Sequence, residues 1–360
     1  MRVTINDIAK ATGYSKTTVS FAFNAPRQIS AEAREKIVET ATELGYVPDP
    51  IARSLSQRNL GTIGLLLPHP IPFALKNPYM VRLISGLGHV CNDEGLSLTM
   101  LPPKRGDLLK SVRGAVVDGL VTIGLDPEDE IVQIIRHRHM PFVSIDGTIA
   151  PDVPSIGVDD RRAADVAMTH LLEQGHRRIG IVMLEESRSP DLEAYSGIGL
   201  KRMHGYEDAL ARFGMSSTDP EVAIFHEPCS VEGGRRAAQL LIEEYPETTG
   251  VVSMSDIIAV GIYQGVHSAG LRIPEDLSLV GFDDIQEAAL LSPPLTTVHQ
   301  PAEEKGRRAG ELLVRMIAGS AVEHPVEFKC RLVRRQSVLT LTVGPGGSAA
   351  AGSSEPVAGR

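Results

Sequence analysis

The chain has 360 residues, of which 42% are hydrophobic, 22% charged and 4% aromatic. This composition is ordinary for a globular protein and argues against a disordered chain, while the length predicts about two or three domains. No apolar run approaches the ~20 residues of a transmembrane helix, and the scarcity of aromatic residues disfavours an RNA-binding platform based on stacking.

The net charge of -9 is unevenly distributed along the chain. Residues 1–60 carry eight Lys or Arg and six Asp or Glu, whereas the remaining residues have a large excess of acids. A small basic segment joined to a large acidic body suggests that only the N-terminal segment approaches nucleic acid.

The first residues of the chain bear on its cellular compartment, and the cysteines bear on disulfides and metal sites. Residues 1–7 contain no apolar segment typical of a secretory signal, so we expect the protein in the cytoplasm. Cys91, Cys229 and Cys330 are far apart in the sequence, which predicts buried thiols rather than disulfides or a metal site. We therefore expect no metal and no cofactor.

Residues 4–45 have the spacing of three short helices. Thr4, Ser15 and Ser30 are typical N-cap residues, each placed before an apolar repeat of three or four residues. Gly13 separates the first two helices and is typical of a tight turn. This pattern predicts a helix-turn-helix.

Residues 61–340 alternate between apolar runs and amphipathic stretches. The runs predicted as strands are 63–67, 120–123, 142–145, 179–183, 250–253 and 277–282, and the predicted helices include 80–91, 163–172, 202–213, 237–245 and 256–269. The alternation predicts an α/β fold with a parallel sheet covered by helices on both faces. Residues 47–60 contain two prolines and form too short a helix to be stable alone, and residues 341–360 read as a flexible tail.

The second predicted helix carries side chains that suit DNA. In this position of a helix-turn-helix, the helix lies in the major groove, and the residues expected to face base edges are Lys16, Thr17, Ser20 and Phe21. Val19, Ala22 and Phe23 are expected to face inward. The hydroxyls of Ser15, Thr18 and Ser30 suit phosphates. A three-helix bundle that contacts another protein is the alternative.

Residues 4–24 (TINDIAKATGYSKTTVSFAFN) closely resemble the N-terminal signature of the LacI/GalR family of bacterial transcriptional regulators. Residues 29–48, and residues 281–284 together with 293–298, are also similar to the family, so the resemblance extends from residue 4 to about 340. It implies that Thr4 and Asn24 also belong to the DNA-binding surface.

The resemblance gives the segment after the helices a role in DNA binding. In the family this segment is a hinge helix that orders on the operator and inserts a leucine into the minor groove, and the matching residue is Leu55. The resemblance also implies close packing at Ala52 and a DNA contact from Arg53. A linker in which Leu55 packs on the body is the alternative.

The resemblance further implies an effector-binding and dimerisation body similar to a periplasmic sugar-binding protein, with two α/β lobes joined by three crossovers. We expect a helix-turn-helix domain over 1–46, the hinge over 47–60, and the body over 61–340. Lobe 1 is expected over 61–158 and 291–322, and lobe 2 over 159–290 and 323–340.

The family's ligand lies in the cleft between the lobes, at the carboxyl ends of parallel strands. The residues that match its ligand positions or follow the first strand are Phe73, Tyr79, Asp146, Arg202 and Asp256. Carboxylates and an arginine suit sugar hydroxyls. The alternatives are that Asp256 caps a helix, that Asp146 lies in a turn, and that Arg202 forms a surface ion pair.

These observations predict a transcriptional regulator that binds a palindromic operator on double-stranded DNA, acting as a repressor under the control of a small-molecule effector, most simply a sugar. A nucleoside, a purine or a sugar phosphate acting as corepressor is the alternative effector. The tail lacks the leucine heptad of the family's tetramers, so we expect a homodimer.

Two other classes of protein compete with this interpretation. Parallel α/β folds host many enzymes, but the sequence contains no nucleophile elbow, zinc-protease motif, P-loop or paired cysteines, so we expect no catalytic residues. A solute-binding protein of a transporter would need export and would have no use for residues 1–60.

Overall fold

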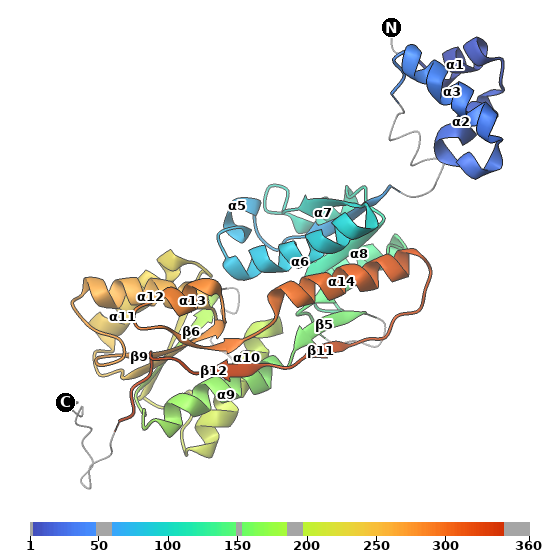
Figure 1. Ribbon diagram of the computed structural model, residues 1–360. Coiled ribbons are helices and arrows are strands. Elements are labelled where there is room, and N and C mark those ends of the chain that lie inside the picture. The colour runs from blue at the N-terminus through green and yellow to red at the C-terminus, as the bar shows by residue number, and fades with distance from the viewer. Residues whose placement is uncertain (1–2, 48–59, 149–152, 186–196, 342–360) are drawn as a thin grey trace, which may run out of the picture. The chain divides into compact units, whose positions relative to one another are not determined.

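The computed structural model describes residues 3–47, 60–148, 153–185 and 197–341. The chain divides into two compact units, a small N-terminal unit with the first helices and a large unit with nearly all of the strands. Figure 1 shows the three helices of the small unit in blue. The predicted combination of an all-α N-terminal part and a parallel α/β body is confirmed.

The small unit consists of α1 (Ile5–Thr12), α2 (Lys16–Asn24), a 3-10 turn (Pro26–Gln28) and α3 (Ala31–Glu43). Gly13 ends α1 with a φ of 77°, a left-handed conformation that glycine adopts without strain, and the chain turns there into α2. Ile8, Val19 and Ile37, one from each α-helix, are fully buried in a common core.

The large unit contains two lobes, each built on a six-stranded sheet. The elements of lobe 1 are β1 (Thr62–Leu66), α5 (Ile71–Ala74), α6 (Pro78–Glu94), β2 (Ser97–Leu101), α7 (Leu108–Arg113), β3 (Gly119–Ile123), α8 (Glu130–His137), β4 (Phe142–Ile145), β5 (Ser155–Val158), α14 (Ala302–Ile317) and β11 (Val326–Phe328). The strand order is β11-β5-β4-β3-β1-β2. Strands β3, β4, β5 and β11 pair in parallel.

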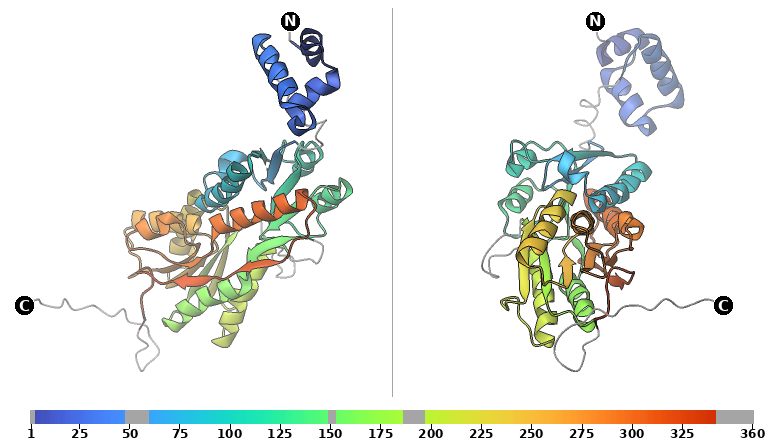
Figure 2. Two further views of the ribbon diagram at one scale, coloured as in Figure 1. Left: turned by 45° about the vertical axis from the view of Figure 1, so that its right-hand side comes forward. Right: turned by 90° about the vertical axis from the view of Figure 1, so that its left-hand side faces the viewer.

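The elements of lobe 2 are α9 (Asp160–Glu173), β6 (Ile179–Leu184), α10 (Gly197–Arg212), β7 (Val222–Glu227), α11 (Val231–Glu244), β8 (Gly250–Ser253), α12 (Asp256–Ser268), β9 (Ser278–Asp283), α13 (Gln286–Leu290), β10 (Thr296–His299) and β12 (Arg331–Val333). The strand order is β12-β10-β9-β8-β6-β7, and within the described residues of this sheet only β12 runs antiparallel to its neighbour. Helices α9 and α10 cover one face of the sheet, and α11 and α12 cover the other (Figure 2).

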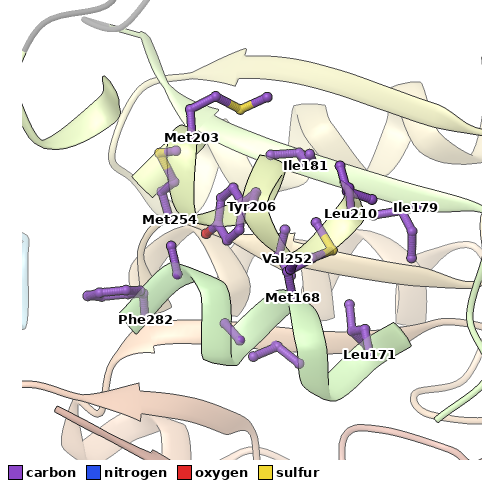
Figure 3. Packing of buried hydrophobic residues seen from close by; sticks show 14 of the residues in the cluster. Met168, Leu171, Ile179, Ile181, Met203, Tyr206, Leu210, Val252, Met254 and Phe282 are labelled. Atoms are coloured by element: carbon purple, nitrogen blue, oxygen red, sulfur yellow. The ribbon is translucent and has the colours of Figure 1, made fainter. Parts of the chain in front are cut away.

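The core of lobe 2 lies between its sheet and the pair of α9 and α10. Figure 3 shows Met168 and Leu171 of α9 and Tyr206 and Leu210 of α10 packed against side chains of β6, β8 and β9. Phe282 lies near the carboxyl end of β9 and is fully buried. This packing fixes the strand ends from which functional side chains project.

The chain crosses between the lobes at positions that differ from the predicted boundaries. Strand β10 pairs with β9, so the segment before His299 belongs to lobe 2 rather than to lobe 1. Strand β11 pairs with β5, so residues 326–328 belong to lobe 1 rather than to lobe 2. The predicted division at residues 291 and 323 is wrong because strand pairing, which the local sequence pattern does not reveal, decides the lobe.

The predicted strands appear within one or two residues of their expected ends, but four of the predicted helices begin earlier than expected, two of them by five residues or more. Helix α10 begins at Gly197 rather than at Arg202, and α11 begins at Val231 rather than at Ala237. Glycines in the first turn of each helix lower the apparent helix propensity and hid these starts. Arg202 consequently lies inside α10 and not at its first position.

Three pairs of helices cross at glycines. A Cβ atom at Gly86 of α6 would lie 1.9 Å from the carbonyl oxygen of Glu303 in α14, and one at Gly306 of α14 would lie 2.0 Å from a carbonyl oxygen of α6. Gly234 and Gly261 have the same relation between α11 and α12, and Gly205 of α10 lies against α9. Only glycine permits this closeness, because any side chain would collide with the partner's backbone.

Candidate DNA-binding surface and interlobe cavity

The first turn of α2 presents polar side chains to solvent. The Ser15 hydroxyl accepts a hydrogen bond from the backbone N–H of Thr18 at 3.1 Å and lies 2.8 Å from the Thr18 hydroxyl. Lys16 and Thr17 are exposed, whereas Val19 and Ala22 are buried. The predicted sides therefore agree with the structure at these four positions, and the half-buried Phe23 packs against the same core.

The other predicted DNA-binding residues of the small unit lie at helix ends or are half-buried. Ser20 and Phe21 are half-buried, and the Asn24 amide donates to the Ser20 hydroxyl at 3.2 Å. The Ser30 hydroxyl accepts from the Ala33 N–H at the start of α3, and the Thr4 hydroxyl donates to Asp7 at the start of α1. Hydrogen bonds from Thr4 lower the pKa of Asp7. Ala52, Arg53 and Leu55 lie outside the described residues.

A cavity of about 130 Å³ lies between the two lobes of the large unit, and we call it the interlobe cavity. Four of the five predicted effector residues line it: Phe73, Tyr79, Asp146 and Arg202. Further apolar lining comes from Pro68, Ala74, Met80, Ile123, Leu184, Ile198 and Met254. The remaining lining residues are His69, Asn77, Cys229, Ser255, Asp283 and Gln300. The cavity therefore combines apolar walls with a few convergent polar groups.

Asp146 follows β4 and belongs to a buried polar cluster in lobe 1. Its φ of 55° is left-handed, which turns the chain at the strand end. Its carboxylate accepts from the Tyr79 hydroxyl at 2.6 Å and from the Lys305 ammonium at 2.6 Å. Burial and the Asp146 carboxylate raise the pKa of Tyr79 well above its usual range, so the phenol stays protonated and donates.

Arg202 is buried on the opposite, lobe 2 side of the cavity. Its guanidinium donates to the Asp160 carboxylate at 2.9 Å and to the backbone carbonyl of Met254, and it lies 3.6 Å above the Phe282 ring. Burial opposes the charge, but Asp160 and Asp283 outweigh burial and raise the pKa of Arg202. The alternative of a surface ion pair is wrong, because Arg202 is 5% exposed.

Asp256 does not line the interlobe cavity, which corrects the prediction made for it. It is the first residue of α12, is fully buried, and accepts from the Ile285 N–H at 3.0 Å and from the Thr297 hydroxyl at 2.6 Å. Burial and the neighbouring Asp283 raise the pKa of Asp256 to about 8. The carboxylate ties three segments of lobe 2 together, and this long-range role is not visible in the sequence around it.

The cavity is also lined by three residues that were not among the predicted effector residues: Ser255, Asp283 and Gln300. The Asp283 carboxylate accepts from the Ser255 hydroxyl at 2.8 Å and from the Gln300 amide. Burial raises the pKa of Asp283 to about 6, although Arg202 acts in the opposite direction. Asp283 could have been found from its position directly after a predicted strand, whereas no local signal marks Gln300.

The described residues were also searched for metal sites and for helices that could span a membrane. Among them, no group of three or more His, Cys, Asp or Glu side chains is placed to hold a metal ion. In the same part of the chain, no helix has the length and apolar character needed to cross a membrane.

The chain matches two family models and many curated proteins. Residues 4–49 match bacterial regulatory proteins of the lacI family, and residues 168–338 match a periplasmic binding protein-like domain. A protein of Mycolicibacterium smegmatis named an HTH-type transcriptional regulator is 33% identical over 87% of this chain and 90% of its own length. The ribose operon repressor of Haemophilus influenzae is 33% identical over 87% of this chain and 92% of its own length.

Solved structures of similar proteins agree with this fold. A transcriptional regulator of the LacI family from Corynebacterium glutamicum has a TM-score of 0.69 and 30% identity, with 93% of this chain and 98% of that chain covered. The transcriptional regulator CelR, solved as a complex with cellobiose, has a TM-score of 0.66 and 27% identity, with 93% of this chain and all of that chain covered.

Proposed function

The chain belongs to the lacI family of bacterial regulatory proteins, and on that premise we propose that it is a repressor that binds a palindromic operator as a homodimer in the cytoplasm. One copy of α2 would enter the major groove of each half-site. The exposed first turn of α2 supports this proposal, because Lys16 and Thr17 project freely while Ser15 and Thr18 form the helix start.

The hinge segment completes the proposed operator contact. We assign the minor-groove wedge to Leu55, with Ala52 at the helix-packing position and Arg53 as a DNA contact, on the resemblance to the family. A wedge unstacks bases at a cost but bends the duplex so that both copies of α2 reach their half-sites.

The effector we propose is an uncharged sugar of one ring in the interlobe cavity. The observation that carries this proposal is that the two buried cations at the cavity, Arg202 and Lys305, are each already paired with a carboxylate. Arg202 is bonded to Asp160, and Lys305, directly behind the wall, is bonded to Asp146. A phosphate would have to displace these carboxylates, whereas sugar hydroxyls donate to carboxylates and accept from arginine without disturbing the charge balance.

The names of similar proteins point in the same direction. One relative is a ribose operon repressor, and one similar structure contains cellobiose. A nucleoside or purine corepressor is the second candidate, and the apolar wall that contains Phe73 and Leu184 favours it, because a flat base would pack there. The volume of about 130 Å³ favours a single small ring over a nucleoside.

The effector would regulate DNA binding by binding two arrangements of the lobes with different affinities. Thermal unfolding should be measured with monosaccharides, sugar phosphates, nucleosides and purines, since a ligand at 100 times its Kd adds about 2.7 kcal/mol of stability. Asp146→Asn should abolish the shift, whereas Asp256→Asn, which changes a carboxylate outside the cavity, should retain it. Stabilisation by sugar phosphates alone would contradict the proposed effector class.

Operator binding with and without the stabilising compound then decides between induction and corepression. Binding of the protein to a palindromic site should fall steeply with salt, because each phosphate contact releases counterions. Binding that is equal for the palindrome and for a scrambled duplex would contradict the proposed operator recognition.

A further inference from the structure

Lys305 is a fully buried lysine on α14. Its ammonium donates to Asp146 Oδ1 at 2.6 Å, to Gln300 Oε1 at 2.6 Å and to the Tyr79 hydroxyl at 3.2 Å. An ammonium has three N–H donors, so these three acceptors satisfy it. A buried lysine keeps its charge only with such partners, which makes the arrangement specific for lysine.

All three partners of Lys305 line the interlobe cavity, although Lys305 itself does not. The ammonium therefore lies directly behind the wall that a ligand touches. One carboxylate oxygen of Asp146 accepts from Lys305 and the other accepts from Tyr79, so both oxygens are already engaged on the protein side. The charge of Asp146 toward the cavity is balanced by the ammonium behind it.

Lys305 also connects Asp146 to the opposite lobe. Because the Gln300 oxygen accepts from Lys305, the Gln300 nitrogen must point the other way, and it donates to Asp283. Asp283 accepts in turn from Ser255. The ammonium thus fixes which end of the Gln300 amide faces lobe 2, and it holds a carboxylate acceptor in place on each side of the cavity.

We propose that Lys305 is a specificity-determining residue that makes the interlobe cavity select uncharged polyhydroxy ligands over ligands that carry an ammonium group. The inference rests on the proposed function of this cavity. With Lys305 present, the two carboxylates nearest the buried cations, Asp146 and Asp160, are both neutralised. Without it, Asp146 faces the cavity uncompensated, and a ligand ammonium supplies the missing cation.

The test uses three variants of the full chain. Lys305→Met removes the ammonium and keeps a long apolar stem, and Lys305→Met combined with Asp146→Asn removes both charges. Lys201→Met is the matched control, since the Lys201 ammonium donates to the carbonyl of Gly147 beside Asp146 but does not contact Asp146 or line the cavity. Calorimetric titrations at pH 6, where the amino sugars carry an ammonium group, would use D-glucose with D-glucosamine, D-galactose with D-galactosamine, and D-mannose with D-mannosamine.

For each sugar and amino sugar that bind, we compare the two dissociation constants. In Lys305→Met we expect their ratio to change by about tenfold or more in favour of the amino sugar, because one buried charge acts over a few ångströms. Lys201→Met should keep the ratio of the unchanged protein. An unchanged ratio in Lys305→Met would overturn the proposal, since a merely structural lysine alters both sugars alike.

A second measurement separates failure of this inference from failure of the proposed sugar effector. If no pair binds any form, the sugar assignment fails, and chemical denaturation at pH 7 decides the role of Lys305. Lys305→Met leaves the buried Asp146 without its cation, whereas the double variant removes both members of the ion pair, so the double variant should be more stable than Lys305→Met. The nearby Tyr79, Asp160, Arg202 and Asp283 are common to both proteins. A double variant no more stable than Lys305→Met would overturn the charge-balancing role.

Discussion

The surface of α2 and the interlobe cavity hold their polar side chains in opposite ways. On α2 the polar side chains are exposed or half-buried, and the hydrogen bonds of Ser15 and Asn24 reach partners three or four residues away. In the cavity the side chains are buried, and Tyr79 and Lys305 reach Asp146 from distant parts of the chain. The first arrangement follows from helix spacing, and the second exists only once two lobes have folded.

This difference predicts where substitutions act. An exposed side chain on α2 is hydrated in the absence of DNA, so its removal changes affinity with little change in stability. A buried polar group in the large unit has a partner that becomes unsatisfied when the group is removed, so its loss first lowers the free energy of unfolding.

The largest effect is expected at Asp256. Asp256→Ala leaves the Ile285 N–H and the Thr297 hydroxyl without their acceptor in a dry interior, which should lower the free energy of unfolding by about 4 kcal/mol. Asp256→Asn keeps an oxygen acceptor and should cost about 1 kcal/mol. Chemical denaturation at pH 7 measures both, and equal losses would show that these hydrogen bonds do not stabilise the fold.

The free energy of unfolding of the unchanged protein and of Asp256→Asn should also depend differently on pH. The pKa of Asp256 is raised to about 8 and that of Asp283 to about 6, so their stabilising contributions are complete below pH 4 and decline as the pH rises through these values. The unchanged protein should therefore lose stability between pH 6.5 and pH 8, and Asp256→Asn should lose less. A steeper alkaline loss in the variant would contradict the assignment.

His176 produces the opposite limb of the stability profile. Burial lowers its pKa to about 4, and its ring bonds to Thr249 and to the carbonyl of Leu339. A lowered histidine pKa contributes stability that is present above the unfolded value of about 6.5 and is lost as the pH falls toward 4, amounting to about 3 kcal/mol. The pKa of His170 is lowered as well and adds to this limb.

His176→Gln should flatten the acid limb between pH 6.5 and pH 4, and urea unfolding at four or five pH values would measure the slope. The slopes of stability against pH are compared rather than the absolute stabilities, because the substitution also removes two hydrogen bonds and so lowers stability at neutral pH. An acid limb as steep as that of the unchanged protein would place its origin elsewhere.

A smaller effect, on operator affinity alone, is expected at Leu55. Leu55→Ala should weaken binding to a palindromic operator by about 2 kcal/mol through loss of the wedge, with no change in thermal stability. Leu60→Ala makes the same substitution a few residues farther along the chain and should leave affinity unchanged. The affinity of both proteins should be measured for a straight operator and for a pre-bent one. If Leu55→Ala binds each operator as tightly as the unchanged protein does, the hinge mechanism is contradicted.

The smallest effect is expected at Lys16. Lys16→Ala should cost about 1 kcal/mol on the cognate operator and relax preference at one base pair in each half-site. Lys10→Ala removes the same charge from α1 and should leave the preference intact. Binding to operators with every base pair varied in turn would decide, and a uniform loss over all sequences would make Lys16 a phosphate contact.

The sequence predicted those features that depend on neighbouring residues. The three N-terminal helices, the buried side of α2 and the strand ends at Asp146 and Asp283 follow from apolar spacing and N-cap residues. The early start of α10 was missed because glycines weaken the helical signal. Local sequence predicts elements because their hydrogen bonds are local.

The composition of the cavity could be predicted only in part, because it depends on partners that are distant in the sequence. Asp146 and Asp256 both stand at or just beyond strand ends, yet only Asp146 lines the cavity, since Asp256 is held by Thr297. Lys305 resembles a solvent-exposed lysine of an amphipathic helix. Its burial follows from the packing of α14 against lobe 1, which no pattern within α14 predicts.

The glycine crossings of the helix pairs bear on attempts to evolve this regulator toward new effectors in the laboratory. Gly86 with Gly306, and Gly234 with Gly261, leave no room for even one added methyl group, so alanine at any of them pushes two helices apart. A mutant library should therefore keep these positions fixed and place its diversity in Phe73 and the other cavity walls. Variants recovered from such a library would differ in what they sense while sharing one rigid frame.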